Sequence, residues 1–119
     1  MQKPADTTFP SWLEMLCGLS AALAIAAGAF AAHGIIDPKA ADWLRTGGLY
    51  QLVHAVAALT ICARAPRVAA LMLAGAALFA GTLYAMAFGA PRWLGAITPI
   101  GGSAMILAWL FFAWGRMRR

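Results

Sequence analysis

Four long apolar stretches occupy almost the whole of this 119-residue chain. They run over residues 12–32, 43–63, 68–88 and 94–114. A helix that crosses the hydrocarbon core of a bilayer needs about 20 mostly apolar residues, and each stretch has that length. Backbone N–H and C=O groups find no water in hydrocarbon, so a continuous apolar segment that spans a bilayer must be helical. The pattern therefore predicts an integral membrane protein with four spanning helices.

The composition agrees, because 63% apolar and 11% charged residues lie outside the mixture typical of soluble domains. The connections between the stretches are short, roughly ten, four and five residues, and short connections make consecutive helices antiparallel neighbours. We therefore expect an all-α fold and a single transmembrane domain over residues 1–119, an integral membrane four-helix antiparallel bundle.

The basic residues indicate how the bundle is oriented in the bilayer. The formal net charge of the chain is +5. This charge does not indicate nucleic-acid binding, since the basic residues gather near helix ends and form no basic surface interleaved with aromatic residues. The two tails and the middle connection carry Lys3, Arg64, Arg67, Arg116, Arg118 and Arg119. The opposite side carries Lys39, Arg45 and Arg92. The positive-inside rule then predicts that both termini are cytoplasmic.

Local features predict how the helices begin and where they approach one another. Asp37 before Pro38 is typical of a helix N-cap and first helical position, and we expect residues 39–45 to form a short amphipathic turn on the membrane surface, with Asp42 paired to Arg45. Small residues at close spacing predict packing faces, either within a tight bundle or also between copies of the protein, and periodicity alone does not separate the two. These are Ala24, Gly28 and Ala32, then Ala77, Gly81 and Ala85, then Gly101 and Gly102. Cys17 and Cys62 lie in apolar segments, which predicts buried thiols.

Polar residues inside the apolar stretches give the strongest functional indication, because each costs free energy in hydrocarbon unless it finds a partner or water. Tyr50, Gln51 and His54 share one helical face, and His54 lies about 16 Å deep, near the midplane. A neutral imidazole there has the chemistry to bind a metal, haem or a proton. The alternative is a hydrogen bond between helices.

Further polar positions fall in the leaflet away from the termini. Pro99 removes a backbone donor and displaces its helix, and irregular backbone at membrane depth is tolerated only where protein or a water-filled cavity covers it. We therefore predict a polar pocket or packed polar core that opens to the non-cytoplasmic side. The candidate ligand-binding residues are His33, Tyr50, Gln51, His54, Tyr84, Thr98 and Pro99.

A family resemblance covers nearly the whole chain after about Pro10. The stretches Gly28–Gly34, Tyr50–Ala55, Gly75–Tyr84 and Gly95–Gly102 resemble, in matching order, the signature stretches of the YgdD/YwdK-like membrane proteins. The resemblance implies a small, multi-pass, four-helix protein of the bacterial inner membrane, with relatives in animals. The family is one of unknown function, so the resemblance implies no reaction and names no cofactor.

Three classes of function remain open. The first is a non-enzymatic protein whose outer-leaflet pocket binds a small ligand, lipid or quinone, or carries a solute. Carrying a solute would require oligomers, because four packed helices leave little lumen for a pathway. The second is an accessory or assembly subunit of a larger membrane complex, in which the polar residues only fix helix register. The third, an enzyme, has least support, because two histidines make no metal site and the deep segments lack Asp and Glu. The expected partners are the lipid bilayer and either a second copy or a larger complex.

Overall fold

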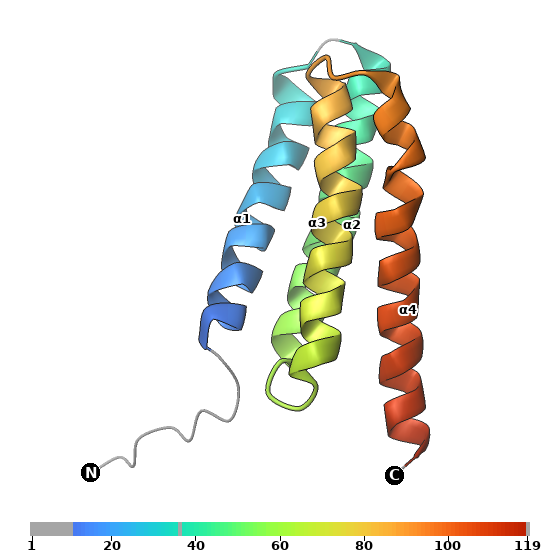
Figure 1. Ribbon diagram of the computed structural model, residues 1–119. Coiled ribbons are helices and arrows are strands. Elements are labelled where there is room, and N and C mark those ends of the chain that lie inside the picture. Colours follow the sequence, from blue (N-terminus) through green and yellow to red (C-terminus); the bar gives the residue numbers. More distant parts are fainter. Residues whose placement is uncertain (1–10, 36, 119) are drawn as a thin grey trace, which may run out of the picture.

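The computed structural model describes residues 11–35 and 37–118, and within them the chain folds into four α-helices and one 3-10 helix without strands (Figure 1). In chain order these are α1 (Ser11–His33), α2 (Pro38–Ile61), α3 (Pro66–Ala87), η1 (Arg92–Ala96) and α4 (Thr98–Met117). Consecutive α-helices run antiparallel. The start of α1, the α2–α3 connection and the end of α4 lie at one end, here called the termini end, and the other two connections form the loop end. Lys3 and Arg119, counted above, lie outside the described residues.

The start of α2 confirms one local prediction and corrects another. The carboxylate of Asp37 accepts a hydrogen bond from the backbone N–H of Lys39 at 3.3 Å, and Pro38 is the first helical residue, as predicted. Asp42 and Arg45 form the expected pair, with 3.2 Å between carboxylate and guanidinium. The separate turn over residues 39–45 was wrong, because α2 continues without interruption into the apolar stretch. Nothing in that segment stops a helix once Asp37 has capped it.

The fourth stretch differs from its prediction at its beginning. Instead of one helix over residues 94–114, the chain forms η1 and then starts α4 at Thr98. Pro99 lies in the first turn of α4, where the N–H that proline lacks has no intrahelical acceptor in any case. The irregular backbone therefore lies just before Pro99, between η1 and α4, and Gly101 and Gly102 continue α4 as regular α-helix.

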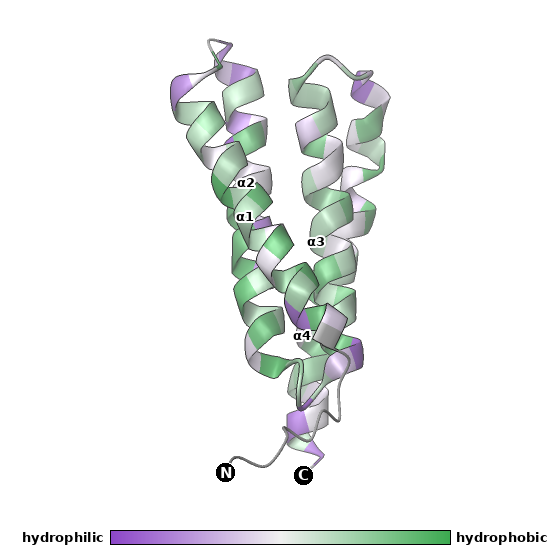
Figure 2. Cartoon of the chain, turned by 90° about the vertical axis from the view of Figure 1, so that its left-hand side faces the viewer, coloured by the Kyte–Doolittle hydropathy of each residue, from purple (hydrophilic) through white to green (hydrophobic). Residues whose placement is uncertain are grey.

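Within residues 11–35 and 37–118, three helical segments are long and apolar enough to cross a membrane: Trp12–His33, Pro66–Ala87 and Arg92–Met117. Apolar residues extend along the helices and hydrophilic ones gather at both ends of the molecule (Figure 2). The exception is α2, which is 24 residues long but carries polar side chains. Those of Gln51 and His54 are each only 4% exposed and point into the protein, whereas the charged residues Lys39, Asp42 and Arg45 in its first turns are exposed.

Two adjacent glycines of α2 allow close approach on two sides. A Cβ atom on Gly47 would lie 3.3 Å from the Cα of Ala80 in α3, and one on Gly48 would lie 3.0 Å from the carbonyl oxygen of Ala24 in α1. Both distances are tighter than ordinary contacts to a Cβ atom. Gly47 and Gly48 therefore let α2 pack directly against the backbones of both neighbours.

A second close crossing joins α3 to α4. A Cβ atom on Gly101 would overlap the backbone nitrogen of Phe79 and lie 2.7 Å from the carbonyl oxygen of Gly75. The small-residue stripe predicted on the third helix does not face the bundle, since Ala77 and Gly81 are exposed, and its alternative role as a self-association face stays a prediction. The residues of α3 that lose all exposure are Ala69, Met72, Ala76 and Ala80. One residue turns a helix by about 100°, which moves a stripe from a protein-facing to an outward position.

The packing predictions for α1 and the cysteines hold in part. Ala24 is buried and Gly28 half-buried, while Ala32 is exposed. Cys17 and Cys62 are free, buried thiols in one cluster with neighbouring apolar residues, as predicted. Both lie in the half of the bundle nearer the termini end.

Candidate functional site

A hydrogen-bonded chain centred on Gln51 connects three helices. Gln51 of α2 donates from Nε2 to the hydroxyl oxygen of Ser20 in α1 at 3.1 Å. Tyr84 of α3 donates its hydroxyl hydrogen to Oε1 of the same amide at 2.6 Å. Because Gln51 is 4% exposed and buried amides require partners, these two bonds fix the rotation of α2 against α1 and α3.

His54 joins α2 to α4 through Trp109. The indole Nε1–H of Trp109 donates to Nε2 of His54 at 3.0 Å. An indole is only a donor, so Nε2 carries no hydrogen, and the imidazole hydrogen resides on Nδ1. Nδ1 lies 2.7 Å from the carbonyl oxygen of Tyr50 and donates to it. Both ring nitrogens are thus engaged in helix contacts. Nδ1 carries the hydrogen and the lone pair of Nε2 accepts from Trp109, so no lone pair is left for a metal ion in this arrangement.

A third contact joins the end of α3 to the start of α4. The hydroxyl oxygens of Thr82 and Thr98 are 2.6 Å apart, and Thr82 also donates to the carbonyl oxygen of Phe79 at 3.0 Å. Thr98 in turn can donate to the carbonyl oxygen of Leu94 at 3.3 Å, and each hydroxyl carries one hydrogen, so either threonine can be the donor between the two. The pair holds the first turn of α4 against α3 near the loop end.

The structure distributes the predicted site residues over these contacts. Gln51 and Tyr84 come together, whereas Tyr50 and His54 lie on the side of α2 that faces α4. Thr98 pairs with a threonine that the sequence did not indicate. His33 and Pro99 are exposed near the loop end. The roles of the seven residues as ligand-binding groups stay a prediction, and most of their polar atoms bind other parts of the protein.

Sequence reasoning missed Ser20, Thr82 and Trp109 as partners. Trp109 carried the clearest signal, since the other tryptophans, such as Trp12 and Trp114, lie at the ends of apolar stretches. A tryptophan inside a stretch has no interface for its N–H and needs an acceptor. Serine and threonine carry a weaker signal, because their hydroxyls are often satisfied by their own helix.

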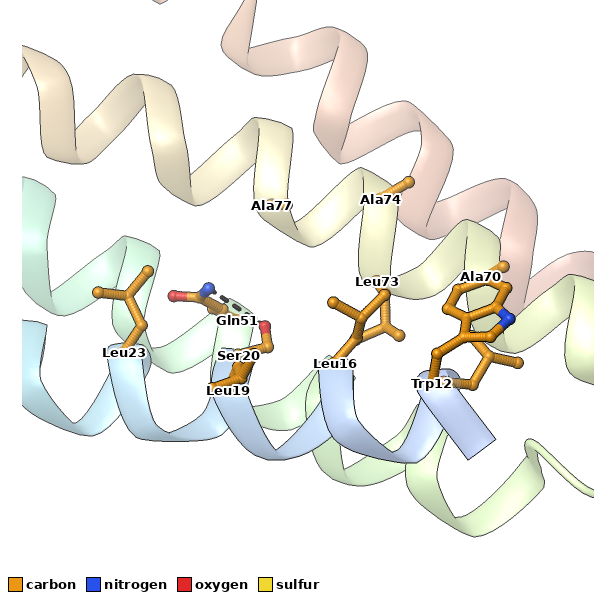
Figure 3. Close-up of a pocket in the computed structure, with 11 residues that line it drawn as sticks. Trp12, Leu16, Leu19, Ser20, Leu23, Gln51, Ala70, Leu73, Ala74 and Ala77 are labelled. Atoms are coloured by element: carbon orange, nitrogen blue, oxygen red, sulfur yellow. Dashed lines mark hydrogen bonds between the residues drawn. The ribbon is translucent and has the colours of Figure 1, made fainter. Parts of the chain in front are cut away.

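A groove of about 450 Å³ runs between α1 and α3, with α2 as its floor (Figure 3). It occupies the half of the molecule nearer the termini end. Its lining residues are Trp12, Leu13, Leu16, Leu19, Ser20, Leu23, Gln51, Ala70, Leu73, Ala74 and Ala77. Figure 3 shows the hydrogen bond from Gln51 to Ser20 on the floor, and Trp12 reaching toward Ala70 at one end. Because its two polar residues bind each other, the groove presents a mainly apolar surface.

A smaller hollow of about 350 Å³ lies between α2 and α4, over α3. It is lined by Tyr50, His54, Phe79, Gly102, Met105, Ile106 and Trp109. The ring centroids of Tyr50 and Phe79 are 5.1 Å apart in an edge-on arrangement. Its side-chain nitrogen atoms are those of the His54–Trp109 hydrogen bond, so it offers a mainly aromatic surface to which Tyr50 adds a hydroxyl.

Comparison with known families matches residues 27–102 to the family described as "Protein of unknown function (DUF423)". The chain belongs to this family. The DUF423 match spans all of α2 and α3 and includes Gln51, His54 and Tyr84. It begins within α1 at residue 27, after Leu23, so it omits all the α1 residues that line the groove.

Similar proteins support the assignment of this DUF423 protein over most of its length. A UPF0382 membrane protein of Haemophilus influenzae is 39% identical over 113 residues, which cover 87% of this chain and 91% of the relative. The UPF0382 membrane protein YwdK of Bacillus subtilis is 35% identical, covering 81% and 88%. The UPF0382 inner membrane protein YgdD of Escherichia coli K12 is 28% identical, covering 90% of each chain. No solved structure matches.

These relatives confirm the predicted YgdD/YwdK-like family. Together with the three membrane-length apolar helices, they establish a multi-pass protein of the bacterial inner membrane. Within the described residues, no three His, Cys, Asp or Glu side chains gather as a metal site would require. The chemistry that the arrangement does offer is an apolar surface of the size of a lipid chain.

Proposed function

We propose that this DUF423 protein binds the apolar chain of a membrane lipid in the groove between α1 and α3, and that it does so without catalysing a reaction. The observation that carries the proposal is the groove itself, about 450 Å³ in volume and lined mostly by leucine and alanine. Hollows of roughly 300–1,000 Å³ with mainly apolar walls are typical of ligand sites. A binding surface of this kind accepts methylene groups and offers little to a polar solute.

In this proposal all four helices span the bilayer as an antiparallel bundle with both termini in the cytoplasm. The outward residues of α2 support its place in hydrocarbon, since Leu49, Val53 and Val56 are each about half exposed and apolar. The termini end carries Arg64, Arg67, Arg116 and Arg118, which supports the cytoplasmic orientation. The groove then faces the cytoplasmic leaflet, whereas the sequence had indicated a pocket in the opposite one.

The packing of the helices fits a lipid chain that enters the groove from the surrounding bilayer, rather than a solute that passes through the bundle. The space between α1, α2 and α3 is narrowed by Gly48 against Ala24 and by Gly47 against Ala80. The Gln51 hydrogen bonds cross the same space. A lipid chain in the plane of the membrane reaches the groove without opening these contacts, so we propose binding and not transport by the monomer.

The test fills the groove and measures retained lipid. Ala74 and Ala77 line it and are exposed, so the double variant Ala74→Phe, Ala77→Phe places two rings in the groove with little disturbance of the core. The protein is released from nanodiscs of defined phospholipid composition and weighed by native mass spectrometry. We expect the wild type to retain one phospholipid per chain and the double variant to lose most of it.

The matched control is Ala113→Phe, an exposed alanine of α4 on a helix that does not line the groove. It adds the same ring to the lipid-facing surface and is expected to retain lipid like the wild type. Equal retention by the double variant would show that the groove does not hold the chain. Thermal unfolding of all three proteins in the same detergent separates lost binding from lost folding.

The second candidate, an accessory subunit of a membrane complex, is favoured by one observation on α4. This helix buries only Gly101, Met105 and Ala108, and its outward face includes Leu110 and Trp114, which are 58% and 55% exposed. A photo-crosslinking residue at Leu110 in native membranes tests this role. A single heavier protein adduct would support a partner subunit, and adducts with lipid alone would remove the reason for proposing one.

A further inference from the structure

The groove ends next to two arginines, Arg64 in the α2–α3 connection and Arg67 in the first turn of α3, which are together called the basic segment. Arg67 is exposed and lies one helical turn before Ala70, the first α3 residue of the groove lining. Positions 67, 70, 74 and 77 follow one another at spacings of three and four, which place them on a single helical stripe. Arg67 therefore continues the α3 wall of the groove toward the termini end, where Trp12 marks the corresponding end of the α1 wall.

The first turn of α3 adds a second, independent feature that attracts anions. Its N-cap residue is Ala65, which makes no side-chain hydrogen bond to the helix. The first helical hydrogen bond of this turn is donated by the N–H of Ala69 to the carbonyl oxygen of Ala65. The preceding N–H groups, those of Arg67 and Val68, have no intrahelical acceptor, and they lie at the positive end of the helix dipole.

The charges around this end are predominantly positive. Arg64 in the α2–α3 connection and Arg67 form no ion pair with another described residue. The last turn of α4, which contains Arg116 and is followed by Arg118, ends at the same end of the molecule (Figure 1), and α4 does not line the groove. The opposing charge on the helices there is Glu14 of α1, which is exposed. An anion at the end of the groove thus meets more positive than negative charge.

The length of the groove fits one lipid chain. Along α1 its lining extends from Trp12 to Leu23, which is about 16 Å at 1.5 Å per residue. Half of the roughly 30 Å hydrocarbon core is about 15 Å. A lipid of the leaflet at the termini end can therefore lay one acyl chain along the groove while its phosphate stays at the level of Arg67.

We propose that the groove and the basic segment together bind one anionic phospholipid, with an acyl chain between α1 and α3 and its phosphate at Arg64, Arg67 and the first turn of α3. This inference rests on the proposed function, and it adds the class of headgroup. A zwitterionic lipid brings an amine as well as a phosphate, and that amine is repelled by the arginines. Each arginine near the surface should favour the anionic lipid about fivefold.

The experiment measures headgroup preference in nanodiscs that contain equal amounts of phosphatidylglycerol and phosphatidylethanolamine with identical acyl chains. Native mass spectrometry gives the ratio of the two lipids retained by the wild type, Arg67→Gln and the double variant Arg64→Gln, Arg67→Gln. We expect the wild type to retain mainly phosphatidylglycerol, Arg67→Gln to lower that preference about fivefold, and the double variant to retain the two lipids about equally.

Arg92→Gln is the matched control, because Arg92 is exposed and belongs to η1 at the loop end. It removes the same charge and should leave the preference unchanged. An equal loss of preference in Arg92→Gln would overturn the proposal, since net charge and not the basic segment would then select the lipid. An unchanged ratio in the double arginine variant would also overturn it.

The groove-filling variant Ala74→Phe, Ala77→Phe distinguishes a failure of the headgroup proposal from a failure of the proposed function. If the chain lies in the groove, this variant loses both phospholipids while its arginines remain. If the arginine variants keep their preference but the groove-filling variant loses lipid, the chain site stands and the headgroup site fails. If the groove-filling variant keeps its lipid, the proposed function fails as well.

Discussion

The helices α2 and α4 show opposite relations between hydropathy and burial. α2 has polar side chains and is not among the three segments apolar enough by themselves to span a membrane, yet it lies between α1 and α3 and buries ten residues. α4 is strongly apolar and buries three. In hydrocarbon an apolar side chain gains little by leaving lipid, whereas an unpaired polar one is costly. Buried polar side chains therefore mark α2 as enclosed, whereas apolar character alone does not separate α4 from α3, which is also strongly apolar and buries nine residues.

The two helices are also held by different contacts. α2 packs a glycine against each of its neighbours, α1 and α3, and the side-chain amide of Gln51 is hydrogen-bonded to both of them. Its position is therefore set from two sides. α4 has one very close crossing, at Gly101, and hydrogen bonds through Trp109 and Thr98. We infer that α4 depends on fewer residues than α2. Four substitutions test this difference, and they are given from the largest expected effect to the smallest.

Gly101→Ala should have the largest effect, because the added methyl group would overlap the backbone of Phe79, which has no rotamer to change. Overpacking against backbone commonly costs about 1–3 kcal/mol, and we expect about 3 kcal/mol here, with α4 displaced from α3. The measurement is the free energy of unfolding in mixed micelles, followed by SDS titration. Gly102→Ala is the control, since its Cβ would lie 3.7 Å from the Phe79 ring. A similar loss in both variants would contradict the close crossing.

Gln51→Leu should come next, at about 2 kcal/mol. It removes two interhelical hydrogen bonds, each worth about 0.6 kcal/mol on average and up to about 1.7, and leaves the hydroxyl of Tyr84 without its acceptor. The same substitution in a Ser20→Ala, Tyr84→Phe background should cost less, because the partners are then absent. Equal costs in the two backgrounds, measured by a double-mutant cycle, would show that the three side chains are not energetically coupled.

Trp109→Phe should cost about 0.6 kcal/mol, the average for one hydrogen bond between membrane helices. The ring that packs on His54 is largely kept, with centroids now 6.0 Å apart, and the N–H that binds the imidazole is lost. A cycle with His54→Ala gives the coupling energy of the pair. Additive effects of the two substitutions would mean that Trp109 does not hold α4 to α2 through this bond.

Asp42→Asn should have the smallest effect, less than about 0.3 kcal/mol. The Asp42–Arg45 pair lies on one helix, and its side chains are 75% and 56% exposed. Water and ions screen such a pair, and it connects no two helices. The unfolding free energy of the variant should match that of the wild type within error, and a loss near that of Gln51→Leu would show that the start of α2 contributes to packing.

The sequence predicted the helices with few errors, because the length and continuity of apolar stretches determine them in hydrocarbon, and it predicted the family through the signature stretches. It also predicted the cap at Asp37, where the signal lies within three residues. It failed where the outcome depended on helix rotation. The small-residue stripe of α3 lies one residue away from the stripe that is buried in the bundle, and Tyr50 and Gln51, one residue apart, proved to point toward different neighbours. Periodicity defines stripes on a helix but leaves open which stripe meets which neighbour.

For this protein the sequence by itself determined a multi-pass, helical membrane protein of the DUF423 family, since twenty apolar residues in a bilayer have few alternatives to a helix. The tertiary structure decided what the polar residues do and where a ligand can lie. Gln51 and His54 became interhelical contacts because Ser20, Tyr84 and Trp109 were within reach. The groove exists because α1 and α3 both pack against α2 and leave the space over Gln51 between their leucines and alanines, an arrangement that depends on distances between helices far apart in the chain.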